Sequence, residues 1–190
     1  MGNHAGVIAA GDQGTAEAGA EILKRGGNAV DAAVGAAFAS FIAEVGVVHL
    51  GGSGIAQIFD PTNGGAVCYD FFSSMPGLGS IRPVSELDFE KVTINFGPTT
   101  QDFYLGRGSV AVPGNVFGLC RMATEHGRLP LAETLKPAIR MAREGVTLAP
   151  FQAETCELLR PLYTHTPGMR SVFSKNGRLL LSDPVHGRIA

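Results

Sequence analysis

Residues Thr15 to Val34 read TAEAGAEILKRGGNAVDAAV, and this stretch predicts two helices that meet at a glycine corner. Apolar side chains of the first half recur at helical spacing on one side of the expected helix: Ala16, Ala20, Ile22 and Leu23. Gly26 and Gly27 follow, and glycine readily adopts the positive φ that ends a helix. The sequence therefore predicts a sharp turn between two helices.

The second helix is expected over residues 29–45, with Asn28 as its N-cap and Asp31 in its first turn. It is apolar on nearly every face, so a membrane span has to be weighed. A span needs about 20 predominantly apolar residues, and acidic residues within it are costly. Asp31 and Glu44 bracket a shorter stretch, and no cluster of Lys or Arg flanks it. We therefore predict a buried, close-packed helix that needs covering on every side.

The composition is that of a globular protein. The chain has 190 residues, of which 45% are hydrophobic and 17% are charged, and its net charge of -2 offers no basic stripe for a nucleic acid. Cys68, Cys120 and Cys156 have neither metal-ligand nor redox spacing, and we expect buried thiols. The N-terminus has no secretion signal, which predicts a cytoplasmic location, or a periplasmic or extracellular one if a signal was removed.

Further elements are expected along the rest of the chain. Residues 6–10 predict a short buried strand, and residues 55–59 and 66–72 predict a hairpin. Residues 73–108 look irregular. The later expectations are a short strand at 110–113, a helix ending at Gly127, two helices abutting at Lys136 and Pro137, a helix at 151–160, and a terminal hairpin over 171–183 that turns at Asn176 and Gly177.

Few residues offer chemistry of their own. Residues 51–54 (GGSG) could cradle a phosphate, but a phosphate loop follows a strand and opens a helix, and here the order is reversed. Tight packing, or amides exposed to a reacting centre, explains these glycines better, and a nucleotide-binding module is the weaker alternative. The histidines lack metal-ligand spacing, and Thr164 and His165 are adjacent residues that point to opposite faces of an extended segment. We predict no metal and no cofactor.

Four segments taken together resemble the gamma-glutamyltranspeptidase family: ILKRGGNAVDAAV at 22–34, LGGSG at 50–54, VPG at 112–114 with the helix that follows it, and KPAIRMAREG at 136–145. They occur in the family's order at compatible distances. The resemblance implies an α+β N-terminal nucleophile hydrolase fold, an αββα sandwich. Residues 1–190 would be the N-terminal part of the family's large chain and therefore an incomplete domain.

The resemblance also implies an activity. In this family a threonine becomes the first residue of a small chain when the precursor cleaves itself, and it attacks the amide of a gamma-glutamyl or related acyl donor to give an acyl-enzyme. Water or an amino acceptor then resolves the acyl-enzyme. Neither Thr99 and Thr100 nor Thr164 and His165 match that threonine in context. We therefore expect no catalytic residue in this chain, and we expect a small partner chain that supplies the nucleophile.

One departure from the family concerns the substrate. The large chain normally contributes an arginine, in an Asp-Phe-Arg-Glu segment, that grips the substrate's α-carboxylate. Here the run is DFFSSMP at 70–76, with Phe72 in place of the arginine. An aromatic ring cannot replace a fork of charged donors. We take Phe72, Ser73 and Ser74 as substrate-binding candidates, suited to a less charged acyl group.

Three alternatives remain open at this point. Arg82, Arg107 or the partner could supply the missing cation, and Phe72 could be a core residue if the alignment is shifted by a few positions. The loss of the arginine also admits a non-catalytic relative that acts as a scaffold or binding protein.

Overall fold

A computed structural model describes residues 6–77, 79, 87–180 and 188–189. The chain divides into two compact units, each considered by itself below. The first comprises Met1–Ser73 and Pro113–Val146, and the second comprises Ser74–Val112 and Thr147–Ile189. The assignment of residues 1–190 to one larger, incomplete domain stays a prediction.

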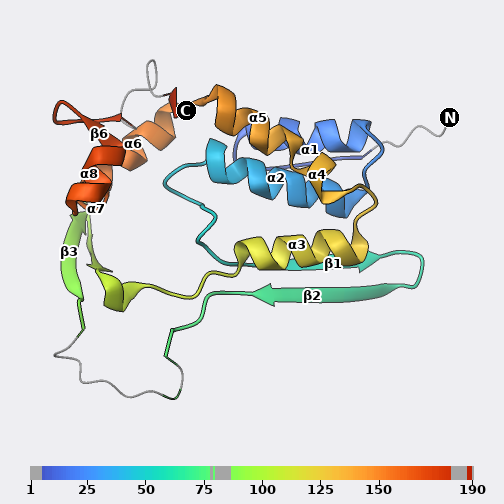
Figure 1. Cartoon of the computed structure of the whole chain (residues 1–190), viewed down its shortest axis with the longest axis horizontal. Coiled ribbons are helices and arrows are strands. Elements are labelled where there is room, and N and C mark those ends of the chain that lie inside the picture. Colours follow the sequence, from blue (N-terminus) through green and yellow to red (C-terminus); the bar gives the residue numbers. More distant parts are fainter. Residues whose placement is uncertain (1–5, 78, 80–86, 181–187, 190) are drawn as a thin grey trace. The chain divides into compact units, whose positions relative to one another are not determined.

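The first unit combines a helical layer with one β-hairpin. Its helices and strands are α1 (Gln13–Lys24), α2 (Ala29–Ala43), α3 (Asn115–His126), α4 (Leu131–Thr134), α5 (Lys136–Glu144), β1 (Gly54–Asp60) and β2 (Gly65–Phe71). Helices α1, α2 and α5 pack together, and α3 lies along the hairpin (Figure 1). The two-helix corner, the first hairpin, the helix ending at Gly127 and the helix pair meeting at Lys136 are confirmed.

The corner between α1 and α2 forms as the glycines predicted, with Gly26 at a φ of 92°. The buried face of α1 differs from the expected one, because it consists of Thr15, Ala18, Gly19 and Ile22. Ala16 and Ala20 are only half-buried. The physical reason is close helix packing: a Cβ on Gly19 would lie 3.2 Å from the carbonyl oxygen of Ala32, so the smallest residue faces α2.

Asp31 holds the start of α2 to the loop after α3. Its carboxylate accepts the amide of Asn28 at 2.9 Å, and Asn28 caps Asp31 in return. The same carboxylate accepts the amide of Arg128 at 3.0 Å and that of Leu129 at 3.3 Å. Asp31 is fully buried, so these backbone donors take the place of water around its charge.

Helix α2 is not covered on every side. Ala29 and Ala33 are exposed, whereas Val34 and Ala39 are fully buried in the core. Among the described helices, none is long and apolar enough to cross a membrane.

The β1–β2 hairpin covers α3 with one face only. Gly54 pairs with Phe71 and Asp60 pairs with Gly65, so the strands are fully antiparallel. Ala56 and Ile58 are half-buried and pack against the core, whereas Ile55 and Phe59 alternate with them and are each 64% exposed. The hairpin therefore has an apolar outer face that nothing in the described residues covers.

The expected strand at residues 6–10 is wrong as a buried strand. The segment lies outside every strand ladder of the described residues, and Val7 is 99% exposed. A β-strand forms only where a neighbouring strand accepts and donates its backbone hydrogen bonds. The described residues supply no such neighbour for this segment, and the sequence pattern could not reveal that.

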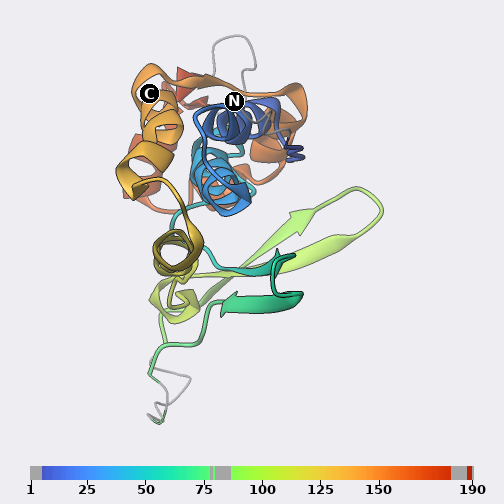
Figure 2. The ribbon, with the colours of Figure 1, turned by 90° about the vertical axis from the view of Figure 1, so that its right-hand side faces the viewer.

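The second unit contains elements that the sequence reasoning missed. Its helices and strands are β3 (Glu90–Asn95), β4 (Thr100–Leu105), the 3₁₀ turn η2 (Arg107–Ser109), α6 (Pro150–Leu158), α7 (Arg160–Tyr163), α8 (Pro167–Phe173), β6 (Ser174–Lys175) and β7 (Arg178–Leu179). Two short strands lie at Val146–Thr147 (β5) and Arg188–Ile189 (β8). The β3–β4 ribbon, seen in Figure 2, corrects the irregular assignment of residues 73–108.

Other expectations for the second unit are confirmed or corrected. Helix α6 is confirmed, and so is the turn at Asn176 and Gly177, where φ is 52° and 76°. Residues 171–173 belong to α8 rather than to a strand, and residues 181–183 lie outside the described residues. The strand at 110–113 is reduced to a single bridge between Val112 and Ser74.

The expectation of buried thiols holds for one cysteine. Cys156 is fully buried in the second unit, Cys120 is half-buried and Cys68 is exposed on β2. The prediction was wrong for Cys68 because its strand turns one face away from the core.

Candidate functional site

Three segments of the first unit converge at one place: the glycine-rich loop 49–54, the end of β2 and the start of α3. The carbonyl oxygen of Gly52 accepts two amides from the start of α3, those of Gly114 and Asn115, each at 3.1 Å. The first turn of α3 therefore binds the loop with its backbone donors. These two amides are occupied by protein and are not free to bind a phosphate.

Asn115 adds a side-chain bond to this contact. It is 7% exposed, and its Nδ2 donates to the carbonyl oxygen of His49 at 3.0 Å. A Cβ on Gly52 would lie 2.9 Å from that Nδ2 and 3.1 Å from the His49 oxygen. The loop can approach α3 this closely only because residue 52 is glycine. The sequence reasoning missed Asn115, although a polar residue directly after VPG at a helix start is a recognisable signal.

The loop also brings a hydroxyl, that of Ser53, to the hydroxyl of Ser73 after β2. Ser53 Oγ lies 3.2 Å from Ser73 Oγ, and both side chains are half-buried. A serine hydroxyl has one donor and two acceptor positions, so a pair joined by one hydrogen bond keeps capacity for a further hydrogen-bonding partner. The structure thus brings the candidate Ser73 together with Ser53, which the sequence reasoning had treated only as part of a glycine-rich loop.

Phe72 is a surface residue at this site. Its side chain is 66% exposed, and its amide donates to Asp70 Oδ1 at 2.9 Å. The preceding residue, Phe71, points inward and packs against Gly118 of α3. The contact is so close that a Cβ added to Gly118 would lie 2.7 Å from the Phe71 Cβ. The reading of Phe72 as a core residue is therefore wrong.

The third candidate, Ser74, falls in the second unit, where its carbonyl oxygen accepts the amide of Val112 at 2.8 Å. Arg107 belongs to that unit as well, and its Nε lies 3.1 Å from Asp88 Oδ2. The amide and the guanidinium of Arg107 lower the pKa of the Asp88 carboxyl. Arg82, the other alternative cation, lies outside the described residues.

The electrostatics of the site follow from the sequence once the segments are placed. No Lys or Arg occurs between Arg25 and Arg82, or between Arg107 and Arg121. The loop, the end of β2 and the first turn of α3 all fall within these gaps. These three segments therefore contribute no cationic Lys or Arg side chain to the site. They do contribute an acid, Asp70, whose carboxylate accepts the Phe72 amide.

The threonine and histidine pairs have local structural contacts in the second unit. Thr164 Oγ1 donates to the carbonyl oxygen of Arg160 at 2.9 Å, and the Arg170 guanidinium donates to the carbonyl oxygens of Thr164 and His165. Thr99 lies at the turn between β3 and β4. Among the described residues, no three His, Cys, Asp or Glu side chains are grouped as metal ligands.

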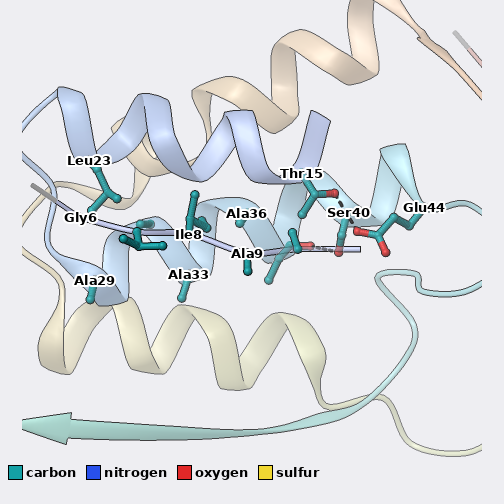
Figure 3. A pocket seen from close by; sticks show the side chains of 14 residues that line it. Gly6, Ile8, Ala9, Thr15, Leu23, Ala29, Ala33, Ala36, Ser40 and Glu44 are labelled. Atoms are coloured by element: carbon teal, nitrogen blue, oxygen red, sulfur yellow. Dashed lines mark hydrogen bonds between the residues drawn. The ribbon is translucent and has the colours of Figure 1, made fainter. Parts of the chain in front are cut away.

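A separate groove of about 540 Å³ lies between residues 6–10 and helices α1 and α2 (Figure 3). Alanines of α2 contribute five of its fourteen lining residues, and at one end Thr15 Oγ1 donates to Glu44 Oε1 at 2.8 Å. Its lining is apolar except at that end, so it resembles a packing surface more than a reaction site.

Comparisons with known proteins agree with the sequence resemblance. The family model described as gamma-glutamyltranspeptidase matches residues 15–185. Glutathione hydrolase 3 of Arabidopsis thaliana is 32% identical over 180 residues, which cover 92% of this chain and 26% of that protein. The acylase ACY 1 proenzyme of Pseudomonas sp. (strain SE83) is 34% identical over 165 residues, covering 86% of this chain and 29% of the proenzyme. The chain thus spans less than a third of the length of these relatives.

Solved structures of the same kind are similar in fold. The crystal structure of Helicobacter pylori gamma-glutamyltranspeptidase gives a TM-score of 0.72 at 27% identity, covering 94% of this chain and 49% of that one. Cephalosporin acylase from Bacillus halodurans gives a TM-score of 0.64 at 26% identity, over 87% of this chain and 30% of that one. The family match over most of the length, together with these neighbours, shows that this α+β chain belongs to the gamma-glutamyltranspeptidase family of N-terminal nucleophile hydrolases.

Proposed function

We propose that this chain is the large-chain portion of an amidohydrolase or acyltransferase that cleaves an amide through an acyl-enzyme. The observation that carries the proposal is the family match over residues 15–185. The nucleophile in this proposal is a threonine on a small partner chain, whose own amine serves as the base. The released acyl group passes to water or to an amino acceptor.

The partner chain also has a structural task in this proposal. The outer face of the hairpin, with Ile55 and Phe59, and the extended residues 6–10 leave apolar side chains and backbone groups exposed. Burying such surface stabilises a complex, and exposed apolar faces mark interaction sites. We propose that the small chain covers both, and that the complex works in the cytoplasm.

The acyl donor belongs near Phe72, Ser73 and Ser74 in this proposal. These residues stand where the family resemblance places its carboxylate-binding arginine. The relatives include proteins named glutathione hydrolase and others named acylase, so both gamma-glutamyl amides and other acyl amides are donors to be tested.

Co-expression tests the division of labour. The chain produced with the remainder of its precursor should yield two polypeptides by mass spectrometry and should hydrolyse an acyl p-nitroanilide. The chain alone should be inactive, since no catalytic residue is assigned to it. A protein that stays unprocessed and cleaves no donor would instead favour the non-catalytic relative. Activity of the chain alone would refute the proposal that the nucleophile lies on a partner chain.

A further inference from the structure

The hydroxyl pair of Ser53 and Ser73 lies in a setting suited to a neutral ligand. The two oxygens are 3.2 Å apart and half-buried. The adjacent residue Phe72, which follows the end of β2, is 66% exposed and apolar. A ligand placed here would meet an aromatic surface and two uncharged hydrogen-bonding groups.

A carboxylate would find no matching charge in the segments that build this place. They lack Lys and Arg, the nearby Asp70 is an acid bound to the Phe72 amide, and Gly52 occupies the amides of Gly114 and Asn115. Bringing an ionised group out of water without a counter-charge or charge-assisted donors costs far more than bringing in an amide that finds hydrogen bonds.

The Asn115 side chain is one of the attachments that hold the loop carrying Ser53 against α3. The buried amide ties His49 to α3, while the α3 backbone ties Gly52, so the residue next to Ser53 is bonded directly to the helix. Without the Asn115 donor, the His49 carbonyl would still accept the Gly52 amide at 3.0 Å, but the loop would lose one of its attachments to α3.

We propose that Ser53 and Ser73 form the hydrogen-bonding part of an acyl-donor subsite that selects uncharged acyl groups, with Asn115 as the residue that positions Ser53. The inference rests on the proposed function, because it takes the donor to bind beside Phe72. The ligand class is an acyl amide whose distal end is a neutral polar group such as a carboxamide.

Three p-nitroanilides of similar length test the charge preference in the co-expressed two-chain enzyme. They carry a 4-carbamoylbutanoyl, a 4-carboxybutanoyl and a pentanoyl group, so the first two differ in charge and the third lacks a polar end. We expect kcat/KM for the carbamoyl donor to exceed that for the carboxylate donor by about tenfold or more.

Serine variants test the hydrogen bonds. Ser53→Ala and Ser73→Ala should each raise KM for the carbamoyl donor about three- to tenfold, and by a larger factor than for the pentanoyl donor, which has no polar end to bond. Ser109→Ala is the matched control, because that hydroxyl donates only to the Gly106 carbonyl in the second unit. It should leave all three donors unchanged.

Asn115→Asp tests the positioning role, since it keeps the size of the side chain and removes the donor to His49. It should raise KM for the carbamoyl donor several-fold in the wild-type background and by less than twofold when Ser53 is already alanine. Asn115→Ser serves as the second variant if the aspartate lowers the melting temperature. Equal effects in both backgrounds would show that Asn115 does not act through Ser53.

The outcomes separate this inference from the function it rests on. An active enzyme that prefers the carboxylate donor, or one whose serine variants behave as wild type, overturns the neutral subsite and leaves the amidohydrolase intact. A precursor that cleaves itself correctly but hydrolyses neither the three donors nor gamma-glutamyl p-nitroanilide overturns both the neutral subsite and the amidohydrolase function.

Discussion

At the scale of single residues, Asp31 has a structural role that depends on contacts with residues far away in the sequence. The sequence predicted Asn28 as the N-cap of α2 and Asp31 in its first turn, and the structure confirms both and adds a reciprocal bond from Asp31 to the Asn28 amide. The amides of Arg128 and Leu129 complete the set of donors around the carboxylate. These residues are nearly a hundred positions away, so periodicity could not reveal them.

Asp31→Asn tests the importance of this buried carboxylate. The substitution places an NH2 group against backbone donors, and we expect the free energy of unfolding to fall by roughly 3 kcal/mol. Urea unfolding followed by circular dichroism measures the change.

Asp102→Asn is the control for that measurement, because Asp102 is exposed and pairs with Lys91 on the surface of the β3–β4 ribbon. Its loss should cost no more than about 1 kcal/mol. Equal losses for both variants would mean that the Asp31 contacts contribute no more than a surface pair.

At the scale of elements, close packing between α1, α2 and α4 depends on glycine. Gly35 faces Ile22, and a Cβ there would also lie 2.8 Å from the carbonyl oxygen of Thr134. The backbone oxygen cannot move aside as a flexible side chain can, so the space for one methyl group is missing.

Gly35→Ala should therefore destabilise the protein by about 1–3 kcal/mol, although alanine favours a helix by about 1 kcal/mol over glycine. Gly168→Ala in α8 is the matched control, since a Cβ there meets no atom closer than 4.0 Å. The control should be neutral or slightly stabilising. Thermal unfolding compares the two, and a stabilised Gly35→Ala variant would refute the tight contact.

In the second unit, Tyr163 of α7 is half-buried and shares a hydrogen bond with Cys156 of α6. Its ring contacts that of Phe173 in α8 edge-on, with the ring centroids 5.0 Å apart. Burial, followed by the influence of Cys156, raises the pKa of Tyr163 to about 12 from the ordinary value of 10.0. The folded state therefore holds the phenol proton more tightly than the unfolded state does.

The sign of the pH dependence follows from this shift. The contribution of Tyr163 is fully present below pH 10 and is lost as the pH rises from 10 to about 12. We expect the melting temperature to fall over that window, and Tyr163→Phe should make the fall shallower. An unchanged slope in the variant would assign the alkaline loss to other groups.

At the scale of the whole molecule, the small partner chain that we propose would cover apolar surface that the first unit leaves exposed. The first unit exposes Ile55 and Phe59 on one side of a two-stranded sheet. Isolated two-stranded hairpins are marginal, and packing against a further layer stabilises them.

Phe59→Ser tests that view of the hairpin. The substitution should leave the melting temperature of the chain within a degree or two, because the ring is mostly exposed, but it should reduce co-purification with the small chain several-fold. Phe151→Ser in α6 is the control, with a ring that is 71% exposed in the other unit. Normal recovery of the small chain with Phe59→Ser would exclude the outer face as the contact.

Much of this chain was predictable from the sequence alone, namely the helix corner, the first hairpin, the proline-divided helix pair and the family. The three structural features depend on glycine and proline conformations, capping residues and short-range periodicity, all of which are local properties. The family, and Phe72 in the place of its arginine, followed instead from the resemblance of several segments to known sequences.

The tertiary structure decided the rest because those features depend on partners distant in sequence. It placed Ser53 against Ser73 and Asn115 against His49, it exposed Phe72 while packing the partly buried Phe71 against the core, and it surrounded Asp31 with amides from another loop. It also left residues 6–10 outside a ladder and formed a ribbon at 90–105 that looked irregular. A strand or a polar site exists only when its neighbours satisfy its hydrogen bonds, and the chain's path in space supplies those neighbours.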